Sequence, residues 1–249
     1  MQQLVQYIYS IADNCLILGQ RLGEMCGHGP SLETDIALTN ISLDLLGQTR
    51  SYYQYAAQCL GAPATEDTIA FTRTEREYKN VLLAEQPNTD FAYVTARHFY
   101  FDVFHLLFLE KLQQSANPAL AAIANKAVKE VSYHRRFSSD WVKRLGDGTA
   151  ESRQRMQMAI DDLFIFTDEL FHETDADIEM IKSGVGVSLN ELRAPYYQAV
   201  RDILAEATLT MPESPYFRSG GKKGIHSEHM GYILADLQYM QRTFPNMKW

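Results

Sequence analysis

The spacing of apolar residues constrains the fold of this chain more than any other feature of its sequence. In two long segments the apolar residues recur at alternating intervals of four and three, which is the seam of a helix packed nearly parallel to a neighbour. No Asn-Gly or Asp-Gly turn separates alternating runs, so signals for β-strands are almost absent. The pattern therefore predicts an all-α protein. The seams consist of Leu4, Ile8, Ile11, Cys15, Leu18, Leu22 and Met25, and of Leu120, Ala124, Ala127, Val131, His134, Ser138, Trp141 and Leu145.

Capping and helix-breaking residues divide the chain into four long helices, joined by connections suited to antiparallel neighbours, and several shorter helices. Two capping boxes, Thr72-x-x-Glu75 and Ser188-x-x-Glu191, predict the starts of two shorter helices. This arrangement predicts a four-helix bundle with additional peripheral helices. The long helices are expected to end before residue 27 and to cover about 32–60, 91–114 and 118–145. The shorter helices are expected over about 73–86, 149–171, 189–208 and 226–244, with loops at 61–71 and 212–224.

Composition narrows the class of protein further. The chain has 249 residues, of which 46% are hydrophobic, and this suits one sizeable core and one domain over residues 1–249. The net charge of -8 argues against non-specific binding to nucleic acid or to anionic membranes. No apolar run approaches the ~20 residues of a membrane span, and the amino terminus lacks a signal-peptide pattern. The odd number of cysteines without CxxC spacing (Cys15, Cys26, Cys59) predicts reduced thiols in a cytoplasmic protein, with Cys15 in the core.

Polar residues interrupt one helix that is expected to be buried nearly all round. The segment from Phe99 to Leu109 is apolar on every face except at Asp102 and His105, which lie three residues apart and so on the same face. A buried carboxylate without a partner costs several kcal/mol, so Asp102 must be paired, hydrogen-bonded or bound to a metal. A structural polar pair is the favoured interpretation for Asp102 and His105, and a metal site is the alternative.

Carboxylates on other helices raise the possibility of a di-iron centre. Asp44 lies among apolar residues of the second helix, and Glu130 lies beside the inward seam of the fourth, where His134 is. A di-iron site in a bundle uses a Glu from each of two helices and a Glu-x-x-His unit from each of two more. The favoured interpretation of Glu130 and His134 is a structural network, because buried polar groups are nearly always satisfied by protein partners.

The Glu-x-x-His units that a di-iron site needs are missing from the long helices. Glu169-x-x-His172 is the one match, and it lies outside the four long helices, where a solvated helix end is the favoured interpretation. Glu130 is followed at the third position by Tyr133, and Asp44 is followed by Gly47, which has no side chain to ligate a metal. The sequence therefore predicts no catalytic residues and no metal site in this chain.

Motifs spread from one end to the other resemble the PaaC family, the C subunits of the bacterial phenylacetyl-CoA 1,2-epoxidase. The resemblance implies one ferritin-like domain in a structural subunit that is itself not catalytic and works in aerobic phenylacetate catabolism. It implies a catalytic A subunit with a di-iron centre as partner, a bridging B subunit, and a reductase subunit in the full monooxygenase complex. The motifs are Asp13–Glu24 with Cys26–Pro30, Leu43–Gln48, Phe71–Arg73, Glu85–Asn88 and Gly220–Gly224.

Setting this chain against the di-iron template of the family implies a degenerate site. Both histidines are missing and the acidic positions persist, so hydrogen-bond donors from the chain are expected to replace the metal. The degenerate positions are Asp102, the two units Asp44-x-x-Gly47 and Glu130-x-x-Tyr133, and a first-helix position near Asn14. The candidate donors are His105, His134, Tyr133, Lys126 and Arg50.

A basic loop stands out in this acidic protein. Lys222 and Lys223 lie among glycines that include Gly220 and Gly221, and the loop runs into the start of a helix, which favours anions. The specific hypothesis is that the two lysines contact the phosphates of a coenzyme A bound mainly by the partner subunit. A mobile solvated turn, or a salt-bridge patch at a subunit interface, is the alternative.

Three functions compete on these observations. The first is a non-catalytic partner subunit. The second is a di-metal oxygenase with an unusual ligand set, and the third is an acyl-CoA-binding module that acts alone. The aromatic stretch 51–55 and the pair Tyr196-Tyr197 are candidate interface anchors, and ordinary packing inside the bundle is the alternative for both.

Overall fold

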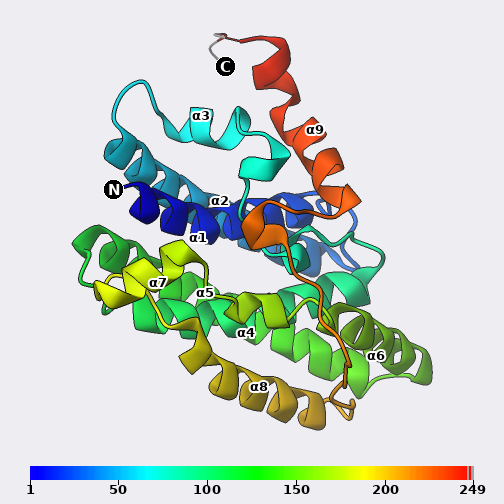
Figure 1. Cartoon of the computed structure of the whole chain (residues 1–249). Helices are drawn as coiled ribbons and strands as arrows, with labels where there is room; N and C mark the ends of the chain where they lie inside the picture. The colour runs from blue at the N-terminus through cyan, green and yellow to red at the C-terminus, as the bar shows by residue number, and fades with distance from the viewer. Residues whose placement is uncertain (246, 248–249) are drawn as a thin grey trace. The chain divides into compact units, whose positions relative to one another are not determined.

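The computed structural model describes residues 1–245 and 247. In that part of the chain every regular element is a helix: nine α-helices and four short 3₁₀ helices, with no strand. The chain divides into two compact units, the first made of Met1–Glu85 with Gly220–Trp249 and the second of Gln86–Ser219. Each unit is built on one pair of long helices (Figure 1). The predicted all-α, ferritin-like fold class is confirmed, whereas one domain over the whole chain stays a prediction.

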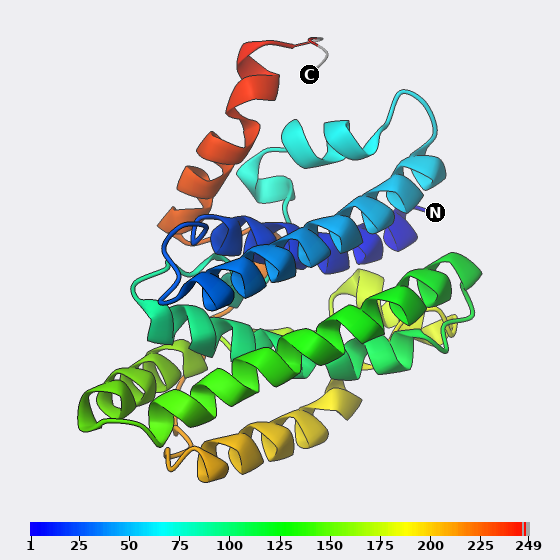
Figure 2. The same ribbon diagram turned by 180° about the vertical axis from the view of Figure 1, so that it is seen from behind.

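The first unit is built on a hairpin of two long helices, α1 and α2, that run side by side (Figure 2). The predicted seam of α1 is buried from Ile8 to Leu22, and Cys15 lies in this core as expected. Ser31 caps α2 by accepting a hydrogen bond from the Thr34 backbone N–H at 3.3 Å. The elements of this unit are α1 (Gln2–Gly23), α2 (Leu32–Leu60), α3 (Glu66–Phe71), η1 (Glu75–Glu77), η2 (Leu82–Glu85), η4 (Gly221–Lys223) and α9 (Glu228–Thr243).

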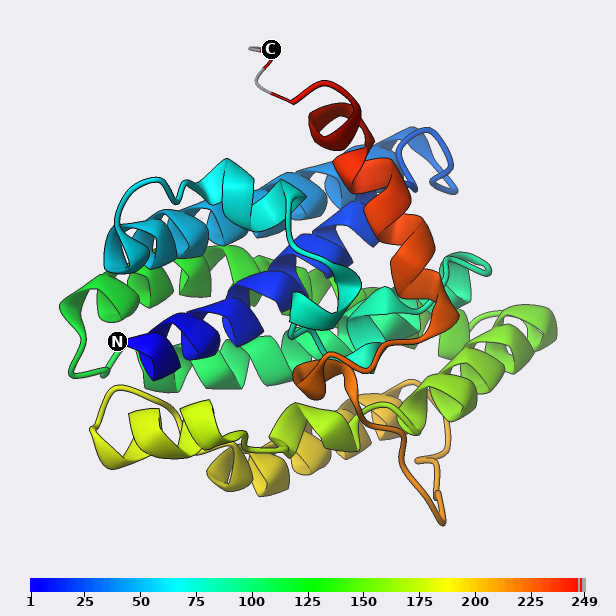
Figure 3. The same cartoon turned by 45° about the horizontal axis from the view of Figure 1, so that its top comes forward.

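The segment after α2 differs from the prediction. A helix, α3, begins inside the expected loop because Thr65 and Thr68 form a capping box there. The predicted helix opened by Thr72 is wrong, since only the two 3₁₀ turns η1 and η2 form between residues 72 and 86. The reason is that polar side chains of α1 bind this backbone: Lys79 N–H donates to Asp13 at 2.7 Å and Val81 N–H to Asn14 at 2.8 Å. Figure 3 shows α9 running alongside this segment and α3.

The second unit is built on the hairpin of α4 and α5. Asp90 caps α4, and Asn117 caps α5 with Pro118 at its first position, as predicted. Almost every residue of α4 from Ala92 to Leu109 is buried, which agrees with its apolar character on all faces. The elements of this unit are α4 (Phe91–Leu112), α5 (Pro118–Gly146), α6 (Ala150–Phe164), η3 (Asp168–Phe171), α7 (Asp175–Lys182) and α8 (Leu189–Glu206).

Two boundaries in the second unit differ from the prediction. The helix expected to reach residue 171 ends at Phe164, and the chain then forms η3. The predicted Ser188 cap is wrong: the Ser188 side chain makes no cap hydrogen bond, and Glu173 accepts from the Leu189 N–H at 2.9 Å instead. A carboxylate from a neighbouring loop therefore satisfies the free N–H groups of α8. No helix of the described residues has the length and apolar character needed to cross a membrane.

Candidate functional site

Asp102 is the centre of a buried polar cluster in the second unit. Its side chain is 1% exposed, and the Ser138 hydroxyl on α5 donates to its Oδ2 at 2.8 Å. His98 Nδ1 lies 3.9 Å from its Oδ1, one helical turn away on α4. Burial raises the pKa of Asp102 to about 7, against the opposing effects of His134 and of the Ser138 hydrogen bond. Burial therefore favours the protonated, uncharged form of this carboxyl group well above its ordinary pH range.

Three buried histidines lie on the two helices that carry Asp102 and Ser138. His98, His105 and His134 are all buried, the first two on α4 and the third on α5. Burial holds the pKa of His98 well below its ordinary value and lowers the pKa of His105 to about 3, with His134 contributing in the same direction. His98 and His105 are consequently neutral at physiological pH. The burial of Asp102 and His105 is confirmed, whereas their direct pairing stays a prediction.

The other degenerate di-iron positions of this unit lie elsewhere on their helix. Tyr133 is 39% exposed and so lies away from the buried face of α5. Glu130 is half-buried, and Lys126, another expected donor, is exposed. Tyr133 is therefore wrong as a donor to buried Asp102, and Ser138 supplies that hydrogen bond. Ser138 belongs to the predicted seam, so its place on the inward face was visible in the sequence although its role was not.

In the first unit, the corresponding positions offer little to a metal. Asp44 is half-buried, and Gly47 is exposed with open space where a Cβ would stand. Asn14 uses its amide group for backbone contacts, donating to Ser10 O and accepting from Val81 N–H, both at 2.8 Å. Of the predicted donors in this unit, Arg50 is exposed and lies 3.7 Å from Glu66. These side chains do not fit a di-iron centre.

The remaining acidic and imidazole groups do not supply a metal site either. Within either unit, the described residues bring together no three His, Cys, Asp or Glu side chains that could hold a metal ion. Glu169 is buried in η3, which corrects its expected place at a solvated helix end. His172 does lie at such an end, hydrogen-bonded to Asp168 at 3.0 Å. Its backbone is extended after the last residue of η3, and its N–H donates to the Glu169 carbonyl oxygen at 3.1 Å.

A buried ion pair in the first unit was not anticipated. Asp13 on α1 is fully buried, and the Arg73 guanidinium donates to its two oxygens at 2.6 and 3.0 Å. The Tyr53 hydroxyl and the Lys79 N–H complete the acceptor sites at 2.5 and 2.7 Å. The guanidinium also lies 4.2 Å from the ring centre of Tyr78. Both charged residues occur in the family motifs, but their spacing of sixty positions hides the contact.

A second buried pair holds the basic loop. His226 Nδ1 and Glu85 Oε2 are 2.9 Å apart, and both side chains are fully buried. Burial lowers the pKa of His226, but the hydrogen bond and the charge of Glu85 outweigh this and raise its pKa above the ordinary value. Glu85 also accepts from the Ser227 N–H at 2.6 Å and from the Asn80 amide at 3.2 Å. One carboxylate therefore links η2 to the start of α9.

The predicted anion loop itself forms the 3₁₀ turn η4. Gly220 and Gly221 are buried, Lys222 is half-buried and Lys223 is exposed. A Cβ at Gly221 would stand 2.1 Å from the Asn80 carbonyl oxygen, so only glycine fits there. Ile225 N–H donates to Gly220 O at 2.9 Å and closes the turn. The loop therefore forms a 3₁₀ turn that a backbone hydrogen bond closes.

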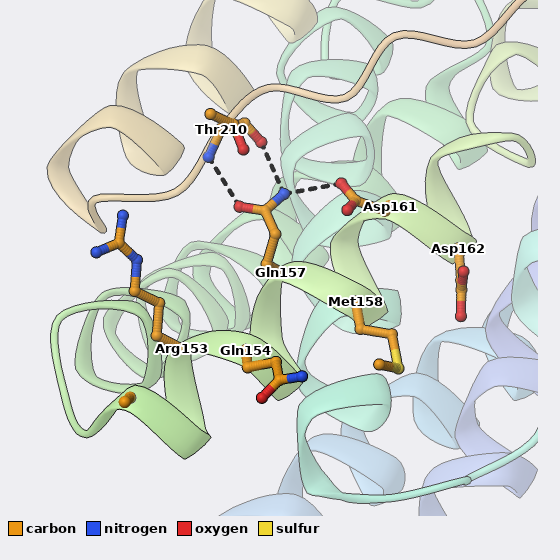
Figure 4. A pocket seen from close by; sticks show the side chains of 8 residues that line it. Arg153, Gln154, Gln157, Met158, Asp161, Asp162 and Thr210 are labelled. Carbon is orange, nitrogen blue, oxygen red and sulfur yellow. Dashed lines mark hydrogen bonds between the residues drawn. The ribbon is translucent and has the colours of Figure 1, made fainter.

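A surface hollow of about 630 Å³ lies along α6 in the second unit (Figure 4). The Gln157 amide bridges Asp161 at 2.7 Å and the backbone of Thr210 at 2.9 and 3.1 Å. Arg153 donates to the carbonyl of Thr208 at 2.7 Å. These polar groups join the 208–210 segment to α6. The hollow offers no nucleophile with a base beside it.

Comparison with known proteins gives one consistent result. Residues 1–249 match the family described as phenylacetic acid catabolic protein. The chain is also 49% identical over 249 residues to the C subunit of the 1,2-phenylacetyl-CoA epoxidase of Escherichia coli (strain K12), and the match covers 100% of both chains. Both findings confirm the resemblance seen in the sequence motifs. The chain is a member of the phenylacetic acid catabolic protein family.

Proposed function

We propose that this chain is a non-catalytic structural subunit of a phenylacetyl-CoA epoxidase, in which it stabilises a partner A subunit that carries a di-iron centre. The full-length identity to the C subunit of such an epoxidase supports the place in the complex. The state of Asp102 supports the non-catalytic role. Its carboxyl group is buried against Ser138 with a pKa near 7, in a unit whose described residues gather no three metal-binding side chains.

The energetics of the Asp102 cluster explain how a bundle can do without a metal. A buried carboxylate is costly unless it is paired, bound or neutral. Here the Ser138 hydroxyl satisfies Oδ2 of Asp102, and the raised pKa favours the protonated form, which carries no charge. His98 and His105 are neutral and so add no uncompensated charge to the buried part of α4. The oxygen chemistry then belongs to the partner, where a di-iron centre would be held.

Co-expression with the catalytic subunit of the same operon tests this function. The chain should elute with that subunit in size-exclusion chromatography, and iron should be found in the partner after the two chains are separated. The matched variants Asp102→Asn and Glu130→Gln should leave the iron content and kcat of the complex unchanged. About two irons in the isolated chain, or epoxidation without the partner, would instead establish a di-metal oxygenase. Tight binding of phenylacetyl-CoA by the isolated chain, measured by calorimetry, would favour a binding module that acts alone.

We further propose that the η4 turn contacts the phosphates of the coenzyme A substrate within the complex. Lys223 is exposed and Lys222 half-buried, on a turn that Glu85 and His226 hold at the start of α9. Replacing both lysines with alanine should raise the apparent KM for phenylacetyl-CoA and leave kcat unchanged. The matched control is Lys182→Ala, at an exposed position at the end of α7. An unchanged KM in an intact complex would refute the contact.

A further inference from the structure

The outward face of α2 carries an apolar seam that its own unit leaves uncovered. Leu32, Ile36 and Leu43 are 71, 51 and 60% exposed, although they belong to a helix whose opposite face is buried. The exposed positions Ile36, Asn40, Leu43, Gly47 and Arg50 follow spacings of four, three, four and three. This is the spacing with which one helix packs lengthwise on another. Large exposed aliphatic residues in such a row are typical of an interaction surface.

Gly47 adds a second, independent observation. Glycine is the least favourable residue after proline in the interior of a helix, and Gly47 lies in the middle of α2. A Cβ at this position would meet nothing within 4 Å, so packing inside the described chain does not require glycine here. A helix of another molecule that crosses α2 at Gly47 would benefit from the missing side chain, because its backbone can approach closely.

We propose that this seam, defined by Leu32, Ile36, Leu43 and Gly47, is the surface on which a helix of the partner catalytic subunit docks. The docking rests on the proposed function, since the 49% identical relative is itself named as one subunit of an enzyme. The spacing specifies a helix as the occupant, running nearly along α2 for about 22 Å at 1.5 Å per residue. In this proposal α2 has two roles: its buried face packs inside its own unit, and its exposed face binds the partner helix.

The charged residues at the two ends of the seam predict which charges the partner helix carries. Glu33 is exposed at the amino-terminal end of α2, and Arg50 is exposed beyond Gly47, 3.7 Å from Glu66. A complementary helix presents a basic group near Glu33, an acidic group near Arg50, and a bulky apolar side chain over Gly47.

Of the five tyrosines that the sequence suggested as anchors, three are buried, and Tyr55 and Tyr197 are half-buried. Tyr52, Tyr53 and Tyr196 are fully buried inside their own units and are wrong as interface anchors. They pack in the helix cores, which was the alternative interpretation. The exposed aliphatic residues of α2 therefore remain the better candidates for contact with a partner.

The α9 helix is the competing surface, and it provides the matched control. Tyr232 is 71% exposed on α9, as exposed as Leu32, but its neighbours on that face include Glu228 and Asp236. Tyr232→Lys and Leu43→Lys each introduce one positive charge in place of an exposed hydrophobic side chain. The two variants therefore separate docking on α2 from a general effect of removing an exposed hydrophobic side chain.

The test measures binding to the catalytic subunit, co-expressed or immobilised, for the whole chain and its variants. Leu43→Lys and Gly47→Leu should each weaken binding at least about tenfold, whereas Tyr232→Lys should bind like the wild type. Gly47→Leu has an opposite expected effect on the isolated chain: its Tm should be unchanged or higher, because leucine favours the helix and has open space. Loss of binding together with a retained Tm cannot be attributed to misfolding.

The possible results distinguish this inference from the proposed function. Failure of the wild-type chain to bind the catalytic subunit at all contradicts the function itself. A wild-type chain that binds, with Leu43→Lys and Gly47→Leu binding equally well, overturns the docking face and leaves the function standing. A loss caused by Tyr232→Lys alone would place the interface on α9. If light scattering shows an isolated dimer that Leu43→Lys converts to a monomer, with unchanged binding to the catalytic subunit, a second copy occupies the seam and the inference is wrong.

Discussion

Replacing Arg73 with methionine should destabilise the first unit strongly. The guanidinium is 8% exposed and donates to both oxygens of Asp13, at 2.6 and 3.0 Å, and to the Tyr53 hydroxyl at 2.7 Å. Burial lowers the pKa of Arg73, but the charge of Asp13 more than compensates and keeps the guanidinium firmly protonated. Methionine fills part of the volume and leaves Asp13 as a buried carboxylate without its counter-charge.

The size of the effect follows from the bonds that are lost. A hydrogen bond to a charged group contributes about 1.5–3 kcal/mol, and two such bonds to Asp13 disappear. Breaking a buried pair by removing one partner typically costs about 3–5 kcal/mol. Asp13 keeps two donors, the Tyr53 hydroxyl and the Lys79 N–H, which limits the loss. We therefore expect Arg73→Met to lower the free energy of unfolding by about 4 kcal/mol.

Urea unfolding followed by circular dichroism measures this change, with Arg201→Met, at an exposed position of α8, as the control. The double variant Asp13→Asn with Arg73→Met should be more stable than Arg73→Met alone, since no unpaired charge remains. If Arg73→Met stays within about 1 kcal/mol of the wild type, the pair contributes little and the reasoning is refuted. Strictly additive effects of the two substitutions would refute it as well.

Three further outcomes follow from individual buried groups. The pKa of Asp102 is raised from 3.8 to about 7, so its protonation stabilises the folded state. This contribution to the free energy of unfolding is fully present below about pH 4 and is lost as the pH rises to about 7. Between about pH 4 and 8, the free energy of unfolding should therefore fall by roughly 4 kcal/mol less in Asp102→Asn than in the wild type. An unchanged pH profile contradicts the raised pKa. The pKa of His226 is also raised, so its pairing with Glu85 stabilises below about pH 6.5 and fades as the pH passes its folded value; His226→Gln should be most destabilising at low pH, and an effect independent of pH counts against the pairing. Gly221→Ala places a Cβ 2.1 Å from Asn80 O and should lower the Tm and speed proteolysis near residue 221; an unaltered Tm shows that the turn can shift freely.

The candidate site was only partly predictable from sequence. Asp102 stood out because it interrupts a helix that is apolar on every face, and its burial is confirmed. Its hydrogen-bond donor, Ser138, lies on another helix. A serine on a helix seam does not by itself indicate which residue it will bind. Tyr133 was one of the candidate hydrogen-bond donors to the carboxylates, but its position on α5 is exposed. The direction of a side chain there depends on how the helix is rotated against its neighbours, which spacing alone does not specify.

The sequence by itself determined the long helices, since apolar spacing and the caps Ser31, Asp90 and Asn117 are local signals. The conformation of residues 72–86 and of the basic loop depended on tertiary contacts. Residues 72–86 form turns instead of a helix because Asp13 and Asn14 bind their backbone. The basic loop is fixed by His226 on Glu85, 141 positions earlier in the chain. Such contacts join distant segments, and their free energy depends on burial that no local pattern of residues records.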